Sequence, residues 1–213
     1  MKLYTKPGAC SLSDHIVLEW IGKPFEVKVL TAAEMKEPAY LAINPAGAVP
    51  AITEGDWALT QNAAILNYLA DSHPEAKLGG DGTPKGRAEV NRWLAFFNAD
   101  VHPAFHPIFG STAFLEDAQV IEKTKAAARK KLRTLFERAN AQLERHDWIA
   151  GSRSIADAYL YVTLRWAEKT GVDLSGLDRL AAFKARMDAD AGVRRALKTE
   201  GLLDDKPATQ AAA

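Results

Sequence analysis

The sequence predicts a small α/β domain followed by an all-helical domain. Residues 1–76 alternate short strand patterns with helix patterns. Over 84–205 helical patterns dominate, and we find no convincing strand there. Between them, the stretch "KLGGDGTP" begins at residue 77 and contains three glycines and a proline, a composition typical of a linker. We therefore assign residues 77–83 to a linker and residues 206–213 to a flexible tail.

The first domain begins with a strand candidate, "KLYT", at residues 2–5. A helix is predicted over 11–22, because apolar residues recur at near-helical spacing and Gly22 provides a stop signal. Residues 24–30, "PFEVKVL", alternate apolar and polar side chains and predict a second strand. A strand, a helix and a second strand in this order predict a parallel pair.

Residues 49–60 predict a β-hairpin. Two short strand patterns flank Gly55 and Asp56, a dipeptide that favours the tight turns of hairpins. A helix follows from residue 61 and ends near Pro74. The first domain is therefore expected to be a sheet of about four strands covered by helices.

The second domain is expected to contain about five helices. The first covers residues 85–102 and ends at Pro103. From Ser111 to Ala150 there is neither glycine nor proline, and one long helix is expected there. Its apolar face consists of Ile121, Ala128, Leu132, Leu135, Ala139 and Leu143. The remaining helices cover 154–171, 177–190 and 192–201.

Composition and charge exclude several classes of partner. Lysine plus arginine and aspartate plus glutamate each number 27, so net charge does not favour nucleic acid. No apolar run approaches the ~18 residues that span a bilayer, so no membrane partner is expected. The single cysteine cannot form an internal disulfide and fits a reducing compartment. Since no signal-peptide pattern opens the chain, we expect a cytoplasmic protein.

The stretch "SIAD" at residues 154–157 fits the capping-box pattern of a helix start. Ser154 is the expected N-cap, and the Asp157 carboxylate reaches back to the Ser154 N–H. The following helix is apolar on nearly all faces, so it should run through the centre of the helical domain. Because a buried helix start has no water for its amides, the pair is expected to be structural. Replacing Asp157 should cost about 1 kcal/mol or more.

Cys10 follows a Pro7-Gly8 turn and stands at the start of the first predicted helix. Unpaired N–H groups and partial positive charge at such a position stabilise a thiolate and predict a cysteine pKa below about 8.5. The alternative is that Cys10 is a small buried residue without chemistry. A dithiol oxidoreductase is disfavoured, because there is no second cysteine to resolve a mixed disulfide.

Pro50 opens the first strand of the predicted hairpin. Val49 precedes a proline and is therefore expected to be extended. A cis Val49–Pro50 bond would turn the Val49 N–H and C=O outward, where they can pair with a peptide-like ligand. An ordinary trans proline at a strand start is the alternative.

Four separated motifs occur together in this chain: a cysteine after "KPGA", "INPAGAVPAI", "LTQNAAILNYLAD" and "SIADAYL". In this order and at this spacing they resemble bacterial glutathione S-transferases of the beta class, essentially from end to end. The resemblance implies a thioredoxin-like N-terminal domain, an all-α C-terminal domain and a homodimer. It also implies glutathione as co-substrate, without a metal.

The resemblance further implies roles for individual residues. The cysteinyl backbone of glutathione would pair with Val49, and its thiol would face Cys10. Its γ-glutamyl end would lie at Gln61 and Asn62, and His102 would approach the sulfur. The implied catalytic residues are Cys10 and His102. The implied glutathione-binding residues are Ala9, Cys10, Lys36, Val49, Pro50, Gln61 and Asn62.

Three positions depart from the pattern of that family. Gln61 and Asn62 stand where Glu followed by Ser or Gly is common, and neutral Gln61 accepts a weaker hydrogen bond from an amino group than a carboxylate does. Ala48 replaces a Gln and removes a side-chain donor. These changes predict either a lower glutathione affinity or a different recognition of the γ-glutamyl end.

The second-substrate pocket is expected to involve Phe105, His106, Phe109 and Trp166, with Tyr159 as a further candidate. For the aromatic residues, packing in the core is the alternative. His102 and His106 are four residues apart, as in some metal sites. Since no acidic or cysteine partner is spaced with them, no metal is expected.

The reaction implied is attack of the glutathione thiolate on a small hydrophobic electrophile, with thiol–disulfide or peroxide chemistry at Cys10 in addition. Two alternatives use the same fold, because a fold does not fix a chemistry. One is a glutathione-dependent reductase, lyase or isomerase of narrow specificity. The other is a non-catalytic binding module.

Overall fold

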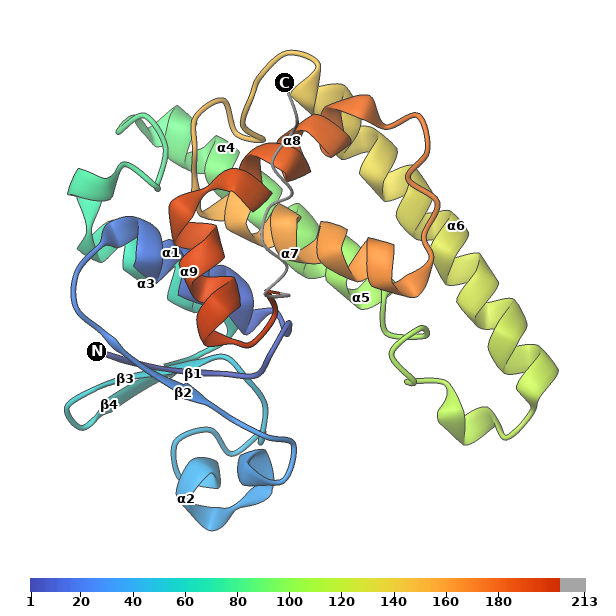
Figure 1. Ribbon diagram of the computed structural model, residues 1–213, viewed down its shortest axis with the longest axis horizontal. Helices are drawn as coiled ribbons and strands as arrows, with labels where there is room; N and C mark the ends of the chain where they lie inside the picture. The colour runs from blue at the N-terminus through green and yellow to red at the C-terminus, as the bar shows by residue number, and fades with distance from the viewer. Residues whose placement is uncertain (204–213) are drawn as a thin grey trace, which may run out of the picture.

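The computed structural model describes residues 1–203, in which a four-stranded sheet lies beside a group of helices (Figure 1). The strands are β1 (Lys2–Thr5), β2 (Glu26–Val29), β3 (Ala51–Glu54) and β4 (Trp57–Thr60). Their order in the sheet is β2-β1-β3-β4. β1 runs parallel to β2 and antiparallel to β3, and β3 and β4 form a hairpin. The predicted fold class is confirmed.

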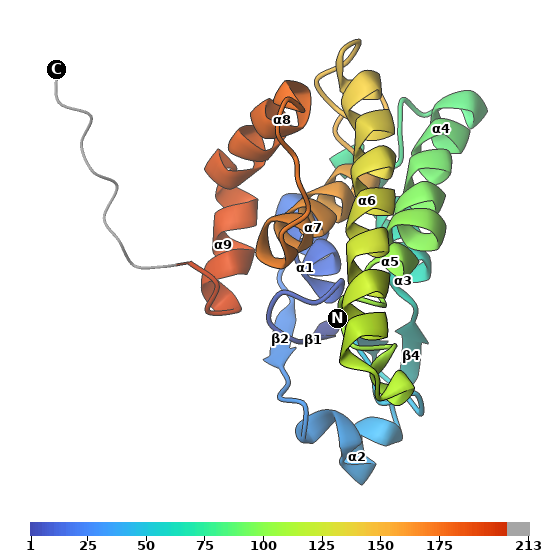
Figure 2. The ribbon, with the colours of Figure 1, turned by 90° about the vertical axis from the view of Figure 1, so that its right-hand side faces the viewer.

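Helices cover both faces of this sheet. α1 (Ser11–Ile21) and α3 (Asn62–Ser72) pack on each other and on the face toward the helical region (Figure 1). α1 ends at Gly22, whose φ of 73° suits a residue without Cβ. α2 (Pro38–Leu41) covers the opposite face at the far end of the molecule (Figure 2). The buried residues of the small core under α2 are Leu30, Tyr40 and Ala51.

The first helix of the helical region contains a π-helical turn that the sequence did not predict. α4 (Pro84–Ala95) continues into the π-helical segment η3 (Phe96–Val101) and then into α5 (His102–Ala104). The chain therefore stays helical past Pro103, where the helix was expected to end. Pro103 lies in the first turn of α5, where the N–H that proline lacks is not needed. Such turns often mark functional sites, and this one directly precedes His102.

Four longer helices follow: α6 (Ala118–Leu143), α7 (Ile155–Thr170), α8 (Asp178–Ala189) and α9 (Ala191–Thr199). α7 is buried along most of its length and packs against α1, α3, α4 and α8, so the prediction of a central helix is confirmed (Figures 1 and 2). α9 returns to the first domain and packs on α1. Single 3₁₀ turns form η1 (Glu34–Lys36), η2 (Pro74–Ala76) and η4 (Ala113–Leu115).

The apolar face predicted for α6 is buried from Ala128 to Leu143. Ile121 is only partly buried, because the first turns of α6 project beyond the other helices (Figure 1). The start of α7 contains the predicted capping contacts. The Ser154 backbone N–H donates to Asp157 Oδ2 at 2.8 Å, and the Ile149 N–H donates to Asp157 Oδ1 at 2.8 Å. The carboxylate therefore also fixes the loop that joins α6 to α7.

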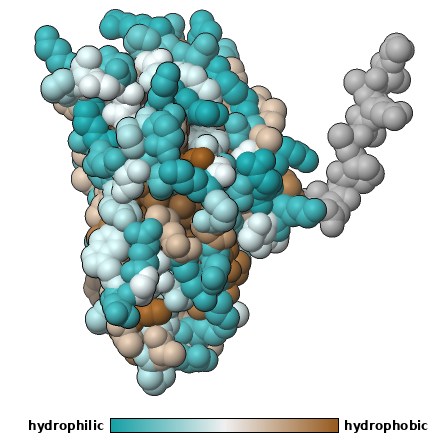
Figure 3. Space-filling view, turned by 90° about the vertical axis from the view of Figure 1, so that its left-hand side faces the viewer, coloured by the Kyte–Doolittle hydropathy of each residue, from teal (hydrophilic) through white to brown (hydrophobic). Residues whose placement is uncertain are grey.

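One hydrophobic core extends from β1 and α1 through α7 to α9. The face in Figure 3 is mostly hydrophilic, with hydrophobic patches across its middle. Among residues 1–203, no helix combines the length and apolar character needed to cross a membrane. The division into 1–76, 77–83 and 84–205 stays a prediction, and the predicted tail lies outside the described residues.

Candidate active site

A cavity of about 170 Å³ opens where the first domain meets the helical region. Its walls come from the loop before α1, the loop before β3, the start of α3, and from η3, α5 and α7. The lining residues are Cys10, Asn44, Ala46, Ala48, Val49, Pro50, Gln61, Asn62, Asn98, His102 and Tyr159. The cavity thus brings together both residues of the predicted catalytic pair and most of the predicted glutathione-binding residues.

Cys10 is the N-cap residue of α1, and its side chain is half-buried. Its Sγ lies 3.7 Å from the carbonyl oxygen of Val49, to which the thiol donates a weak hydrogen bond. Burial, with a smaller contribution from the nearby Asp14, raises the pKa of this thiol to about 12. The N–H groups of Ser11 and Cys10 oppose this rise. The expectation of a depressed pKa is therefore wrong for the unliganded protein, because loss of hydration outweighs the helix N-terminus.

The Val49–Pro50 peptide bond is cis, which decides between the two alternatives raised by the sequence. The loop before it is held by hydrogen bonds to the Ala48 carbonyl oxygen. Tyr40 Oη donates to this oxygen at 2.6 Å, and Asn44 Nδ2 donates to it at 2.7 Å. The edge that faces Cys10 is thereby fixed by Tyr40 and by Asn44, and Asn44 also lines the cavity.

Gln61 and Asn62 form the start of α3. Gln61 is exposed and has a φ of 74°, an uncommon conformation for a residue with a Cβ. Asn62 is buried, and its side-chain amide lies 3.0 Å from Ser13 Oγ, beside Asp14. Burial raises the pKa of Asp14 well above its usual value. The Asn62 side chain is thus engaged with α1, which leaves the backbone amides of α3 for a ligand.

His102 reaches the cavity from α5. Its Nδ1 lies 2.5 Å from Tyr159 Oη, and its ring packs edge-on against Trp166 with centroids 4.7 Å apart. Burial lowers the pKa of His102 to about 4, and the neighbouring His106 contributes in the same direction. The imidazole is therefore neutral at physiological pH.

Sequence reasoning missed Asn98, Asn44 and Ala46 in the cavity wall, and it missed the bond between Tyr159 and His102. Asn98 precedes His102 by four residues, a spacing that places two residues on one helix face and that was a usable signal. Asn44 and Ala46 lie in a loop, where no periodicity indicates which side chain faces a site.

Two domain profiles cover most of the chain. The profile described as "Glutathione S-transferase, N-terminal domain" matches residues 1–71, and "Glutathione S-transferase, C-terminal domain" matches residues 83–190. The chain belongs to the glutathione S-transferase family. A relative from Xanthomonas campestris, glutathione S-transferase GST-4.5, is 62% identical over 203 residues, which cover 95% of this chain and all of the relative. Glutathione S-transferase GstA of Escherichia coli O157:H7 is 38% identical over 207 residues, with 95% and 100% covered.

Solved structures of this family superimpose on the chain over most of its length. A glutathione S-transferase from Xylella fastidiosa is 59% identical, with a TM-score of 0.93 and coverage of 95% of this chain and 99% of its own. A beta-class glutathione S-transferase of Sphingomonas chungbukensis is 34% identical, with a TM-score of 0.84 and coverage of 95% and 100%. A sphingomonad glutathione S-transferase in complex with glutathione is 34% identical, with a TM-score of 0.83 and the same coverage.

In this family member the four residues predicted for a second-substrate pocket do not line the cavity. They form an aromatic cluster behind His102. Phe105 has no exposed surface and belongs to the core, so its predicted place on a pocket wall is wrong. Phe109 stacks on Phe105 with centroids 5.5 Å apart and is 51% exposed. His106 is exposed, whereas Trp166 is buried and its Nε1 donates to the Gly8 carbonyl oxygen at 2.8 Å.

Two predicted glutathione-binding residues lie beside the cavity rather than in its wall. Ala9 is partly buried next to Cys10. Lys36 is exposed, and its Nζ donates at 3.3 Å to the carbonyl oxygen of Gly47, two residues before Val49. Within residues 1–203, no cluster of three or more histidine, cysteine or acidic side chains is arranged to hold a metal ion.

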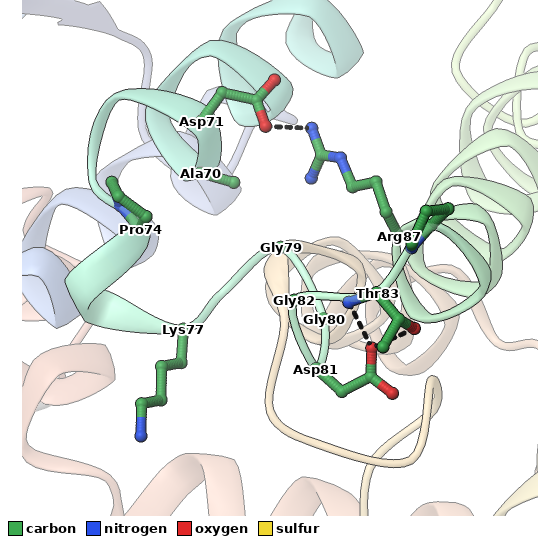
Figure 4. A pocket seen from close by; sticks show the side chains of 11 residues that line it. Ala70, Asp71, Pro74, Lys77, Gly79, Gly80, Asp81, Gly82, Thr83 and Arg87 are labelled. Carbon is green, nitrogen blue, oxygen red and sulfur yellow. Dashed lines mark hydrogen bonds and ion pairs between the residues drawn. The ribbon is translucent and has the colours of Figure 1, made fainter.

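A larger hollow of about 760 Å³ lies along the linker, between the end of α3 and the start of α4 (Figure 4). Arg87 Nη2 bonds Asp71 Oδ1 at 2.9 Å across it, and Asp81 accepts from Thr83. Its lining contains no thiol or imidazole. Arg87 and Asp71 join α3 to α4 and Asp81 fixes the end of the linker, and without a thiol or imidazole the hollow is not the candidate active site despite its size.

A buried polar cluster lies under the loop that carries Cys10. Glu200, just after α9, accepts from Thr5 Oγ1 at 2.8 Å and from the Gly8 N–H at 3.0 Å. Its Oε1 also lies 3.0 Å from His15 Nδ1. The last helix of the described chain is thereby tied to the turn that precedes the cysteine.

Proposed function

We propose that glutathione binds in the cavity beside Cys10 and is the co-substrate of a transfer reaction. The proposal depends on the convergence of Cys10, the cis Val49–Pro50 edge and the start of α3 on one cavity. The Val49 backbone pairs with the cysteinyl unit of glutathione by strand addition. The γ-glutamyl carboxylate lies on the first amides of α3, at Gln61 and Asn62, because a helix N-terminus favours an anion.

The reaction joins the glutathione sulfur to a small hydrophobic electrophile. The glutathione thiol releases its proton to water, and the thiolate attacks the electrophile, which either loses a leaving group with its bonding electrons or, in an addition, takes up a proton from water. The amides at the start of α1 and the His102 ring are placed to donate hydrogen bonds to this thiolate. Lys36 is the group of the first domain that reaches the glycine carboxylate. The electrophile approaches from the side of His106, Phe109 and Trp166, since Phe109 offers exposed aromatic surface there.

Thiol–disulfide exchange at Cys10 is a second candidate, because its sulfur reaches the same cavity. The Cys10 thiolate attacks one sulfur of oxidised glutathione, a Cys10–glutathione disulfide forms, and one glutathione thiolate leaves. The raised pKa of the Cys10 thiol makes this step slow at neutral pH. We therefore propose conjugation of glutathione, rather than disulfide exchange at Cys10, as the main reaction.

We further propose that the protein is a cytoplasmic homodimer, an assembly that membership of this family favours. Trp57 of β4 is 43% exposed and lies against Tyr68 of α3, with ring centroids 4.9 Å apart. This pair offers a second copy of the chain an aromatic surface on the first domain. Light scattering at micromolar concentration tests the proposal, and a monomer mass would contradict it.

Calorimetry with glutathione and intact-mass measurement after incubation with oxidised glutathione test the function. We expect saturable binding, and one glutathione adduct that is lost in Cys10→Ala. Turnover with a panel of hydrophobic electrophiles then separates a transferase from an exchange enzyme. If neither binding nor an adduct is found, both candidate chemistries are wrong.

A further inference from the structure

The contact between Tyr159 and His102 is polar, and a role of Tyr159 as part of an apolar pocket wall does not explain it. The tyrosine is fully buried on α7, yet it reaches the lining of the cavity. Its Oη lies 2.5 Å from His102 Nδ1. Within the described residues His102 is the one hydrogen-bond partner of this hydroxyl at normal length, and the Asn62 side-chain amide is the next polar group beside it. The two side chains therefore form a polar contact inside an otherwise aromatic cluster.

Burial determines the direction of this hydrogen bond. A buried hydroxyl proton without an acceptor is costly, so the Tyr159 hydroxyl must donate. Burial also raises the pKa of Tyr159 above its usual value, and Cys10 adds to this, so the hydroxyl keeps its proton. His102 Nδ1 consequently accepts with its lone pair. In a neutral imidazole the ring hydrogen is then on Nε2.

We propose that Tyr159 is a positioning residue that holds His102 in the Nε2–H tautomer, so that the ring meets the glutathione sulfur as a neutral hydrogen-bond donor. This inference rests on the proposed function for its catalytic consequence. Its structural part, the tautomer, concerns the protein without any ligand. A neutral donor stabilises a thiolate without adding a full positive charge to a partly buried site.

The groups around His102 restrict rotation of its ring and keep the ring neutral at physiological pH. The Trp166 ring packs at 4.7 Å between centroids and the His106 ring at 5.6 Å. The titratable groups around it are His106 one turn on, Tyr159 on α7, and Cys10 with Asp14 behind it on α1. Burial lowers the pKa of His102 to about 4. Above that pH the ring stays neutral, and protonation at Nδ1 would displace the tyrosine hydrogen bond.

Tyr159→Phe tests the proposal, with Tyr161→Phe as its matched control. Both tyrosines are fully buried on the same helix, but Tyr161 Oη donates to Asp188 Oδ1 at 2.6 Å, away from the cavity. Nitrogen-15 NMR of the histidine rings, without glutathione, reads the tautomer directly, and His102→Gln identifies the signal. We expect the Nε2–H form in the wild type and in Tyr161→Phe, and a mixture of tautomers in Tyr159→Phe.

The catalytic consequence is measured separately with glutathione and an electrophile that the wild type turns over. Losing one hydrogen bond that orients a catalytic ring should lower kcat about 10-fold in Tyr159→Phe, while KM for glutathione stays unchanged. A melting temperature equal to that of Tyr161→Phe shows that the loss is not general destabilisation.

Two results would overturn the inference. One is a wild-type His102 with hydrogen on Nδ1, and the other is an unchanged tautomer in Tyr159→Phe. If the tautomer shifts as expected but no electrophile is turned over by the wild type, then the proposed function fails while the role of Tyr159 stands.

Discussion

α7 contributes to two buried polar clusters, through Asp157 at its start and through Tyr159 on the cavity side. The two clusters differ in how many of their polar groups are hydrogen-bonded. At the helix start, the Asp157 carboxylate accepts from two backbone N–H groups and from the Ser154 hydroxyl. On the cavity side, the contacts within residues 1–203 give the Cys10 thiol only a weak bond to Val49 and leave the second ring nitrogen of His102 without a partner. A cluster whose donors and acceptors are all paired fixes the local structure, whereas unpaired donors and acceptors can bind a substrate.

The largest expected effect concerns the thiol of the incomplete cluster. With a pKa of about 12, Cys10 has far less thiolate at pH 8 than an ordinary cysteine, and the greater nucleophilicity of a more basic thiolate offsets only part of this. We expect iodoacetamide to modify Cys10 about 100-fold more slowly than free glutathione at that pH. Mass spectrometry follows the reaction without ambiguity, because the chain has one cysteine.

The pH dependence follows from the same shift. Because deprotonation occurs only near the raised pKa, the alkylation rate should increase about tenfold per unit from pH 7 to about pH 10, without a plateau. A plateau near pH 8 would show a normal or activated thiol and would remove the contrast between the two clusters.

Breaking the satisfied cluster should have the next largest effect. Asp157→Ala leaves the Ile149 and Ser154 N–H groups buried without acceptors, so the free energy of unfolding should fall by about 2–3 kcal/mol. Urea denaturation measures this change. Asp173→Ala is the control, since Asp173 also accepts from a backbone N–H, that of Ser175, but is exposed. Equal losses in the two variants would contradict the importance of burial.

Glu200 belongs to a third cluster, which joins the end of α9 to β1 and to the turn before Cys10. Glu200→Gln keeps the shape but removes the charge and one acceptor, so the free energy of unfolding should fall by about 1–2 kcal/mol. Glu19→Gln is matched to it, because Glu19, on α1, is only partly buried and pairs with the solvent-exposed side chain of Arg195 on α9. That control should change stability by less than about 0.5 kcal/mol, and a larger loss in the control than in Glu200→Gln would contradict this ranking.

The smallest effect should come from Gln61, in the cavity wall at the start of α3. Gln61→Glu introduces a carboxylate for the amino group of glutathione, and a charge-assisted bond should tighten glutathione binding about 5-fold. Gln119→Glu, at the start of α6, makes the same change at an exposed helix start outside the cavity. Calorimetry compares the three proteins. Unchanged affinity in Gln61→Glu would place the γ-glutamyl end elsewhere.

The sequence was sufficient for the fold and for the grouping of the site residues. Short patterns of period two, a helix stop at Gly22 and the hairpin signal at Gly55 are local, so each could be recognised without tertiary information. Cys10, Val49 and His102 come from distant segments, and the order of the motifs, rather than local physics, indicated that they meet.

What the sequence did not predict depends on burial, which no local pattern reports. The helix start at Cys10 favours a thiolate, but the packing of α1 and Asp14 around it reverses the pKa shift. Phe105 and Phe109 have the same chemistry and helical spacing, yet one is core and the other is half exposed. The Tyr159–His102 bond joins residues 57 positions apart, which only the packing of α7 on α5 brings together.

The position of Glu200 has a consequence for how the protein is made. Synthesis begins at the N-terminus, so the strand and turn that carry Thr5 and Gly8 leave the ribosome long before their acceptor exists. Until residue 200 emerges, these buried groups must be hydrated or wrongly paired. The turn before Cys10 therefore takes its final form only after residue 200 has left the ribosome, and a product truncated before Glu200 cannot contain a finished site.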